Sequence, residues 1–130
     1  MDYCQINNLN TDDITVLWLR NNELTDISGL KIFKNLEYLY LWNNRFTDIS
    51  VLKYLTKLKE LSIGYSEIKD ISIIQYLTEL EYLNIDYLEL ESDQIKYVKN
   101  LKNLKELLCK DGFKDMSVLN QLNKNIKTYE

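Results

Sequence analysis

The sequence predicts a single α/β solenoid of about five right-handed coils, with short parallel strands on one side and short helices on the other. Two observations carry this prediction. Apolar residues recur with a period of about 22 residues, and each period opens with an alternating, strand-like pattern. Such self-similarity is typical of solenoids, in which stacked repeats bury one another's apolar sides in one continuous core.

Composition places the chain among soluble proteins and excludes several functions. With 130 residues, 45% hydrophobic and 28% charged, it is the size of one domain. A net charge of −4 argues against nucleic acid, because phosphate binding requires a basic face. No apolar run approaches the ~20 residues of a membrane span. The start, Met1 to Gln5, has no basic or apolar segment of a signal peptide, which predicts a cytoplasmic protein if the chain is complete.

The repeats set the expected boundaries. They begin at Ile14, Leu36, Leu58, Leu80 and Leu104, at spacings of 22, 22, 22 and 24 residues. Positions 1, 4, 6, 11, 14, 17 and 20 are apolar in all five repeats, once two inserted residues are allowed in the fourth and one deletion in the fifth. We therefore expect repeats over 14–35, 36–57, 58–79, 80–103 and 104–125, an N-terminal cap over 1–13, and a truncated sixth strand or C-terminal cap over 126–130.

Two motifs carry a family resemblance. The spacing Leu-x-x-Leu-x-Leu-x-x-Asn over 36–44 resembles the signature of leucine-rich repeats. A second motif resembles the 22-residue class of bacterial internalins and recurs as Thr25-Asp26-Ile27-Ser28, Thr47-Asp48-Ile49-Ser50, Lys69-Asp70-Ile71-Ser72 and Lys114-Asp115-Met116-Ser117. The resemblance implies a curved parallel sheet on a concave face and helical or 3-10 turns on the convex face. The family's proline at position 16 is missing here, where Gly29, Val51, Ile73 and Val118 stand.

Local structure is predicted position by position. Positions 3 to 7 are expected to form the strand, with positions 4 and 6 inward and 3, 5 and 7 outward. Asn22 and Asn44 at position 9 match the family's asparagine ladder, which lapses at Ser66, Leu88 and Gly112. A short helix is expected over positions 13 to 20. The aspartates of position 13 are expected to accept hydrogen bonds from free N–H groups at the helix start, at Asp26, Asp48, Asp70 and Asp115.

The outward strand positions are rich in aromatic residues. They hold both tryptophans and five of the ten tyrosines. Tryptophan, tyrosine and arginine dominate binding hot spots, whereas the structural alternative is that large rings merely favour strands and stiffen the sheet. The predicted partner-binding residues are Trp18, Arg20, Tyr38, Tyr40, Trp42, Tyr65, Tyr82, Asp86 and Tyr87.

Acidic residues form a second feature. The segment 79–93 carries six carboxylates and no basic residue. They are either a solvated rim or a device that steers a basic partner. Glu60, Asp86 and Glu106 share the outward face and could pair for catalysis or bind calcium, but no further feature supports either role. No histidine, phosphate loop or nucleophile motif is present, so no enzyme activity, cofactor or metal is predicted.

The sequence therefore predicts a non-catalytic module that binds a protein, with a basic partner surface favoured. A cytosolic inhibitor, such as a bacterial immunity protein that neutralises a basic toxin, fits this profile. The alternatives are a fragment of a secreted or surface adhesin or effector, and a carbohydrate-binding module. Weak end-to-end self-association is a further expectation. Cys4 and Cys109 are expected to be reduced thiols, because cytosolic disulfides are rare.

Overall fold

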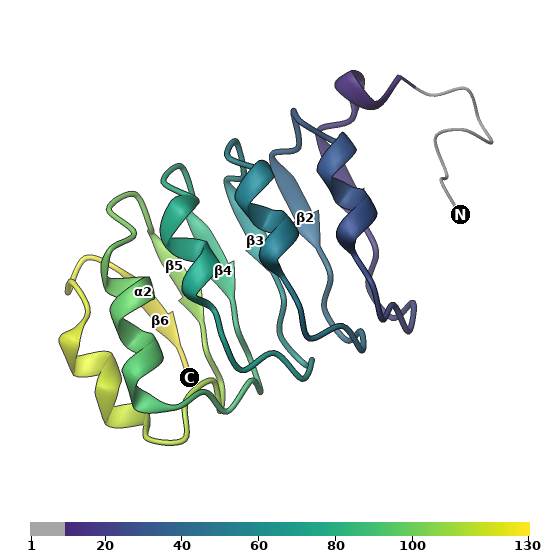
Figure 1. Ribbon diagram of the computed structural model, residues 1–130. Coiled ribbons are helices and arrows are strands. Elements are labelled where there is room, and N and C mark those ends of the chain that lie inside the picture. Colours follow the sequence, from purple (N-terminus) through teal and green to yellow (C-terminus); the bar gives the residue numbers. More distant parts are fainter. Residues whose placement is uncertain (1–9) are drawn as a thin grey trace.

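The computed structural model describes residues 10–130, which form stacked coils with one parallel sheet and a row of short helices in front of it (Figure 1). Neighbouring strands are consecutive in the chain, so the sheet order is β1-β2-β3-β4-β5-β6. The strands are β1 (Val16–Trp18), β2 (Tyr38–Tyr40), β3 (Glu60–Ser62), β4 (Tyr82–Asn84), β5 (Glu106–Leu108) and β6 (Lys127–Tyr129). The predicted solenoid is confirmed. The cap expected over 1–13 lies mostly outside the described residues.

The sheet register follows the repeat. Leu17 pairs with Leu39, Leu39 with Leu61, and Leu61 with Leu83, so each position lies beside its equivalent in the next coil. Each of the first five strands is shorter than predicted and covers positions 3 to 5. A little further along the coil, at position 8, the backbone turns to a positive φ, as at Asn43 (φ 59). A left-handed residue cannot continue an extended strand, so the chain leaves the sheet there.

The opposite side of each coil is a short 3-10 helix. The helices are η1 (Thr11–Asp13), η2 (Ser28–Ile32), η3 (Ser50–Tyr54), η4 (Ser72–Tyr76), η5 (Ser92–Gln94) and η6 (Met116–Gln121). In the fourth repeat, η5 runs directly into α2 (Ile95–Lys99), the α-helix of the described chain. This repeat carries the two inserted residues, which supply the length for the additional turn.

The aspartates of position 13 bond as predicted. Asp48 Oδ1 accepts the Ser50 N–H at 2.8 Å, and the same contact recurs at Asp26, Asp70 and Asp115. The backbone hydrogen bond from Ser50 holds the pKa of Asp48 below its usual value. Its stabilising contribution is therefore present above the ordinary carboxyl pKa and is lost as pH falls through the lowered pKa. This position is structural.

The core lies between the sheet and the helices. Leu39, Leu61 and Leu83 have no exposed surface, whereas Leu17 in the first coil is half-buried. Each interior coil is covered on both sides by its neighbours, which is how solenoids bury their apolar residues. Cys109 is a free, buried thiol whose pKa burial raises to about 12, so it behaves as a small apolar side chain. Cys4 lies outside the described residues.

Candidate binding face

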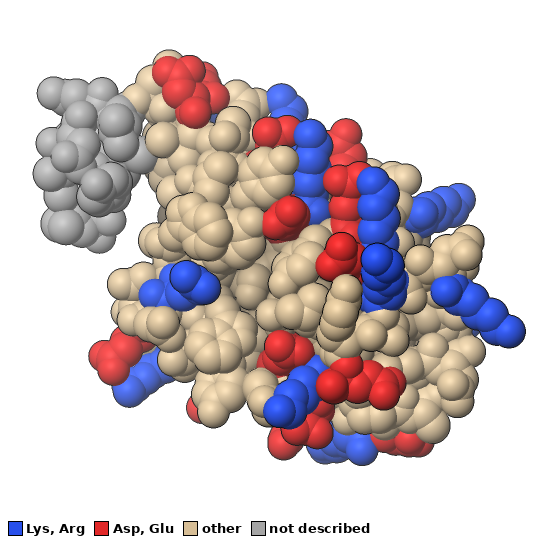
Figure 2. All heavy atoms as spheres, turned by 180° about the vertical axis from the view of Figure 1, so that it is seen from behind, with Lys and Arg blue, Asp and Glu red and all other residues tan. Residues whose placement is uncertain are grey.

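The concave face is the side of the sheet that points away from the helices, and Figure 2 shows it. Strand register aligns its side chains in rows that cross the coils. Position 3 contributes Tyr38, Glu60, Tyr82 and Glu106, each paired with the next. Position 5 contributes Trp18, Tyr40, Ser62, Asn84 and Leu108. Alternation along each strand therefore presents rings and carboxylates together on one surface.

A stacked ring pair lies at the N-terminal end of this face. The rings of Trp18 and Tyr40 are 4.0 Å apart at an interplanar angle of 13°. The guanidinium of Arg20 lies 5.4 Å from the Trp18 ring, a cation–π distance. The Tyr40 hydroxyl donates to Glu60, and burial together with this carboxylate raises the pKa of Tyr40 well above its usual value. Trp18 nevertheless stays 61% exposed, so a large apolar ring faces solvent.

Three further rings form what we call the aromatic ladder (Trp42, Tyr65 and Tyr87). The Trp42 and Tyr65 rings are 5.0 Å apart and tilted by 35°. Tyr65 meets Tyr87 edge to face at 5.1 Å and 79°. Such pairs add about 0.5–1.5 kcal/mol beyond the area they bury. Lys110 Nζ lies 5.7 Å from the Tyr87 ring and ends the ladder. The rings are thus held in place across three coils.

The ladder tyrosines occupy an unusual backbone conformation. Tyr65 has a φ of 56° and Tyr87 a φ of 60°, both in the left-handed region. The equivalent residues of the other coils are Asn21, Asn43 and Asp111, which are also left-handed. Asparagine and aspartate tolerate this region, whereas bulky side chains there are outliers. The two tyrosines therefore carry strain that the asparagines of the same position avoid.

We expect Tyr65→Asn to lower the free energy of unfolding by about 1 kcal/mol less than Tyr38→Asn does, because asparagine relieves the left-handed strain at position 65. The relief of strain offsets part of the loss of ring packing against Trp42 and Tyr87. Urea denaturation followed by circular dichroism measures both losses. Tyr38→Asn is the control, since Tyr38 lies in a strand without a positive φ. A Tyr65 variant destabilised as much as the Tyr38 variant would contradict the strain argument.

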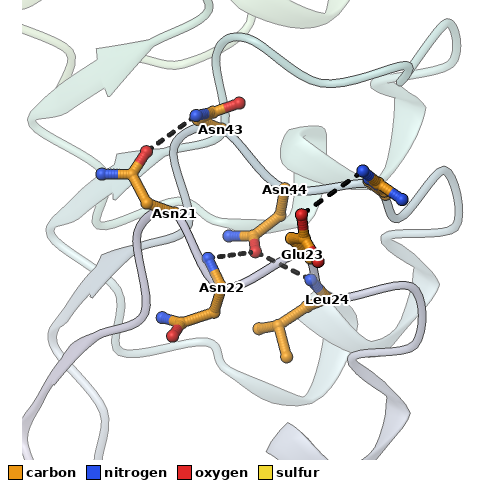
Figure 3. A network of polar contacts seen from close by, with 7 residues as sticks. Asn21, Asn22, Glu23, Leu24, Asn43 and Asn44 are labelled. Carbon is orange, nitrogen blue, oxygen red and sulfur yellow. Dashed lines mark hydrogen bonds and ion pairs between the residues drawn. The ribbon is translucent and has the colours of Figure 1, made fainter.

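An asparagine network holds the turn beside the ladder (Figure 3). Asn44 is 5% exposed, and its Oδ1 accepts the N–H groups of Asn22 at 3.1 Å and Leu24 at 2.9 Å. Its Nδ2 donates to the carbonyl oxygens of Leu19 and Leu41, each at 2.8 Å. The side chain therefore ties the second coil to the first.

The predicted lapse of the asparagine ladder is observed, and each later coil closes its turn differently. Ser66 Oγ donates to the Ile63 carbonyl at 2.9 Å, while Leu88 is fully buried in the core. Gly112 is closely packed, because a Cβ there would lie 3.0 Å from the Cys109 carbonyl oxygen and 3.1 Å from that of Ile85. The polar ladder thus gives way to apolar and glycine packing toward the C-terminus.

Ion pairs of the described chain lie off the concave face. Lys59 pairs with Glu37 at 2.9 Å and Lys105 with Glu81 at 2.7 Å, along the edge where the strands begin. Arg45 pairs with Glu23 at 3.4 Å, and Lys114 with Glu91, near the turns that follow the strands. Figure 2 shows acidic and basic side chains side by side along one margin of this face. Two carboxylates of the acidic segment 79–93, those of Glu81 and Glu91, are therefore neutralised within the chain.

The carboxylates on the concave face differ from those at its margin in their ion pairing. Within residues 10–130, Glu60, Asp86 and Glu106 form no ion pair. Asp86 Oδ1 accepts the Lys110 backbone N–H at 2.8 Å. The hydrogen bond with Tyr87 raises the pKa of Lys110, and the charge of Asp86 adds to this shift, so Asp86 lies within reach of one cation. Burial raises the pKa of Tyr82, and the charges of Asp86, Glu60 and Glu106 add to this shift. The three carboxylates are thus close enough to act on one hydroxyl.

All nine residues proposed from the sequence lie on or beside this one face. The structure divides them into the Trp18–Tyr40 stack with Arg20, the aromatic ladder, and the row of Tyr38 and Tyr82 near Asp86. Sequence reasoning did not single out Ser62, Gly64 and Lys110. The signal for Ser62 and Gly64 was present, because these small residues of the third coil stand where the second coil has Tyr40 and Trp42. Within residues 10–130, no cluster of three or more His, Cys, Asp or Glu is arranged to hold a metal ion.

Comparison with known proteins decides the family. A family model described as "Leucine Rich repeats (2 copies)" matches residues 12–54 and 34–76, which together span half of the chain. The chain belongs to the leucine-rich-repeat family. Leucine-rich-repeat domains in general are scaffolds for protein–protein interaction rather than catalysis. No curated protein sequence matches the chain.

Solved structures place this leucine-rich-repeat chain near the internalins. It is 28% identical to the internalin InlF of Listeria monocytogenes, with a TM-score of 0.84 over 99% of this chain and 37% of that one. The internalin InlC2 of the same species is 33% identical, with a TM-score of 0.65 over 80% of this chain and 45% of that one. A leucine-rich-repeat protein of Leptospira interrogans shares the fold at 22% identity, with a TM-score of 0.67, over 90% of this chain and 37% of that one. The chain thus spans less than half of each of these proteins.

No helix within residues 10–130 is long and apolar enough to cross a membrane.

Proposed function

We propose that this chain is a non-catalytic module that binds a protein partner through its concave aromatic face. The observation that carries the proposal is that large aromatic rings are exposed to solvent and yet held in fixed positions by neighbouring rings. Trp18 is 61% and Tyr65 49% exposed, yet both rings are held by stacking or edge contacts with neighbouring coils. Rings that are rigid before binding lose little entropy in a complex. The strain at Tyr65 and Tyr87 supports recognition as the reason for these residues, because packing alone does not require it.

We further propose a cytosolic inhibitory role, such as a bacterial immunity protein that blocks a basic toxin. The support is the net charge of −4 and the carboxylates among the rings, which form no ion pair within residues 10–130 and suit a basic protein surface. Affinity capture from the source cell tests it, and a basic toxin or nuclease as the specific capture is expected. Capture of housekeeping enzymes alone would sink this role.

Trp42→Ala is expected to weaken partner binding by about 2 kcal/mol or more, roughly 30-fold, because truncating a central aromatic anchor typically has this effect. Wild type and the Trp42→Ala, Tyr40→Ala double variant serve as baits, and calorimetry with the captured protein measures the affinity. The control is Tyr54→Ala with Tyr76→Ala on the helical side, where the two rings are 55% and 59% exposed, more than those of Tyr40 and Trp42. Equal loss in both variants would remove the concave face from the proposal.

Carbohydrate binding is the second candidate function, and one observation favours it. The stacked rings of Trp18 and Tyr40 lie beside the carboxylate of Glu60, which accepts the Tyr40 hydroxyl, and this arrangement also suits sugar rings. Binding on a glycan array, lost in the Trp42→Ala, Tyr40→Ala variant, would establish this function instead. The alternative of a secreted adhesin or effector predicts a longer native reading frame with an export signal. The similarity to internalins supports this alternative.

Weak end-to-end self-association is a separate proposal. Among the described strands, β6 is at the edge of the sheet and pairs only with β5. An unpaired strand edge is a template for pairing with another chain. Light scattering is expected to show dimers at high concentration, and a monomer throughout would exclude this association.

A further inference from the structure

A basic cluster lies in the last coils, on the margin where the helical side leads into the next strand. The segments 94–105 and 116–126 together carry five lysines and no acidic residue, although the chain as a whole has a net charge of −4. The helices α2 and η6 of these segments pack side by side, so the two segments meet in space (Figure 1). Lysines that gather without carboxylates repel one another, which favours an anionic ligand as the reason for them.

The end of α2 and the loops that follow α2 and η6 border a hollow of about 290 Å³. This volume is close to the lower end of the ~300–1,000 Å³ that is typical of small-ligand pockets. Two lysines and two asparagines form its polar lining, and three apolar residues complete it. The lining residues are Lys99, Leu101, Lys102, Leu104, Asn123, Asn125 and Ile126. No carboxylate of residues 10–130 lines this hollow.

The polar side chains of the hollow are mainly hydrogen-bond donors. Each lysine ammonium has three N–H donors and no acceptor. Within residues 10–130, neither Lys99 nor Lys102 has an ion-pair partner. Asn123 Oδ1 accepts the backbone N–H of Asn125 at 2.9 Å, which engages the oxygen of this amide and leaves its Nδ2 group as the end that donates. Two positive charges and amide donors thus border one space.

Structural roles account for only part of this cluster. Lys99 lies in the last turn of α2, where a cation stabilises the carbonyl end of a helix, but that effect does not reach beyond the last turn. Lys102 lies outside α2, in the loop that leads to β5. Of the carboxylates on this margin, Glu81 pairs with Lys105, and neither Glu81 nor Glu79 lines the hollow. Helix capping and internal ion pairs therefore do not explain the charge at the hollow.

The donor set suits a phosphate group better than a carboxylate. Lysine binds phosphate as a point charge, whereas the planar fork of arginine matches a carboxylate, and no arginine of residues 10–130 lines the hollow. A phosphate group carries up to two negative charges, which two ammonium groups balance, and at least three acceptor oxygens that point in different directions. Ammonium and amide groups on two facing loops can reach such oxygens together.

We propose that the lysine hollow (Lys99, Lys102, Asn123 and Asn125) binds a phosphate group, carried by a soluble compound or by a lipid headgroup. The two ammonium groups neutralise its charge, and the asparagine side chains donate to the remaining oxygens. The hollow lies on the margin of the solenoid and not on the concave face, so this site does not depend on the proposed protein-binding function.

The first experiment titrates the full chain, labelled with ¹⁵N, with inorganic phosphate at constant pH and ionic strength, and chloride is the reference anion. Saturable shifts are expected in the amide resonances of Lys102, Asn123 and Asn125. The Lys99→Gln, Lys102→Gln variant should bind phosphate about tenfold more weakly, because both charge-assisted hydrogen bonds are lost. Glutamine has nearly the helix propensity of lysine, so α2 is preserved.

The matched control is Lys31→Gln with Lys34→Gln. These lysines hold positions 18 and 21 of the first repeat, as Lys99 and Lys102 do in the fourth, and the control removes the same charge. Phosphate binding should be unchanged in this control. The absence of saturable shifts, shifts spread over all lysines, or equal weakening in the two variants would overturn the site.

A second variant tests the hollow without removing a lysine. Asn125→Asp places a negative charge in the lining and keeps the backbone N–H that Asn123 accepts. It should abolish phosphate binding, whereas Asn120→Asp, an exposed residue of η6 outside the lining, should leave it within about twofold. Equal loss in these two variants would mean that net charge, and not the hollow, determines binding.

The last experiment distinguishes the two sources of the phosphate group. Vesicles of phosphatidylcholine are prepared with and without phosphatidic acid and sedimented with the full chain. Sedimentation that requires phosphatidic acid and is lost in the Lys99→Gln, Lys102→Gln variant supports the site and identifies a lipid headgroup. Saturable binding of free phosphate without sedimentation supports the site and identifies a soluble ligand. Sedimentation that both lysine variants reduce equally reflects general charge attraction and counts against the site.

Discussion

Replacing Leu61 by alanine should lower the free energy of unfolding by about 3–4 kcal/mol, a large part of the ~5–15 kcal/mol that stabilises a domain. Leu61 has no exposed surface and lies at the middle of the sheet, paired with Leu39 and Leu83. The neighbouring coils hold one another in place, so the cavity left by the truncated side chain cannot collapse easily. Urea denaturation followed by circular dichroism measures the loss.

Leu17→Ala is the control for this prediction. Leu17 occupies position 4 in the first coil, as Leu61 does in the third, but it is only half-buried. Its truncation should cost about 1–2 kcal/mol, because less apolar surface returns to water. Equal losses at Leu17 and Leu61 would show that position in the repeat, rather than burial between two coils, determines the stability.

Asn44→Ala should lower the free energy of unfolding by about 3 kcal/mol, since unpaired buried polar groups cost ~1–3 kcal/mol each and solvent satisfies some of them here. The substitution leaves the N–H groups of Asn22 and Leu24 and the carbonyl oxygens of Leu19 and Leu41 without this partner. Two coils lose their polar link at once. Chemical denaturation measures the effect, and hydrogen exchange of the Asn22 and Leu24 amides should accelerate.

Asn22→Ala is the matched control, because Asn22 holds the same position in the first coil. Its side chain is exposed and donates to the Arg20 carbonyl oxygen alone, at 2.9 Å. We expect a loss below about 1 kcal/mol. A loss at Asn22 as large as at Asn44 would mean that asparagine at this position acts through its own turn and not by bridging two coils.

At the aromatic ladder, the residues that suit partner binding are not the residues that suit folding stability. Tyr65 and Tyr87 adopt a backbone conformation that asparagine takes more easily, as Asn21 and Asn43 do in the first two coils. The backbone strain that Tyr65→Asn relieves and the proposed loss of partner affinity on removing ladder rings are two consequences of the same residue type at this position. Binding surfaces often retain such costs, because a site optimised for recognition is not optimised for folding.

Local pattern was sufficient for the fold and for the placement of the candidate site. The strands and 3-10 helices of repeats one to five lie within their predicted positions, except η5, which begins in the inserted residues of the fourth repeat. The aspartates of position 13 bond as expected. The predicted strand length was wrong: the regular strands end at position 5, although backbone hydrogen bonds between coils continue to position 8, as from the Asn43 N–H to the Gly64 carbonyl oxygen at 3.1 Å. Tyrosine does not favour the left-handed backbone conformation, so the residue type does not predict it at Tyr65 and Tyr87; the turn of the coil imposes it.

The sequence by itself determined the coils, the core positions and which side chains share the concave face. These follow from the 22-residue period of the repeat and the two-residue alternation of the strand, and both can be read directly from the sequence. Only the tertiary structure decided which rings stack and which carboxylates form ion pairs within the chain. These properties depend on rotamers and distances between residues some 22 positions apart, because stacked coils bring together side chains whose contacts no local pattern encodes.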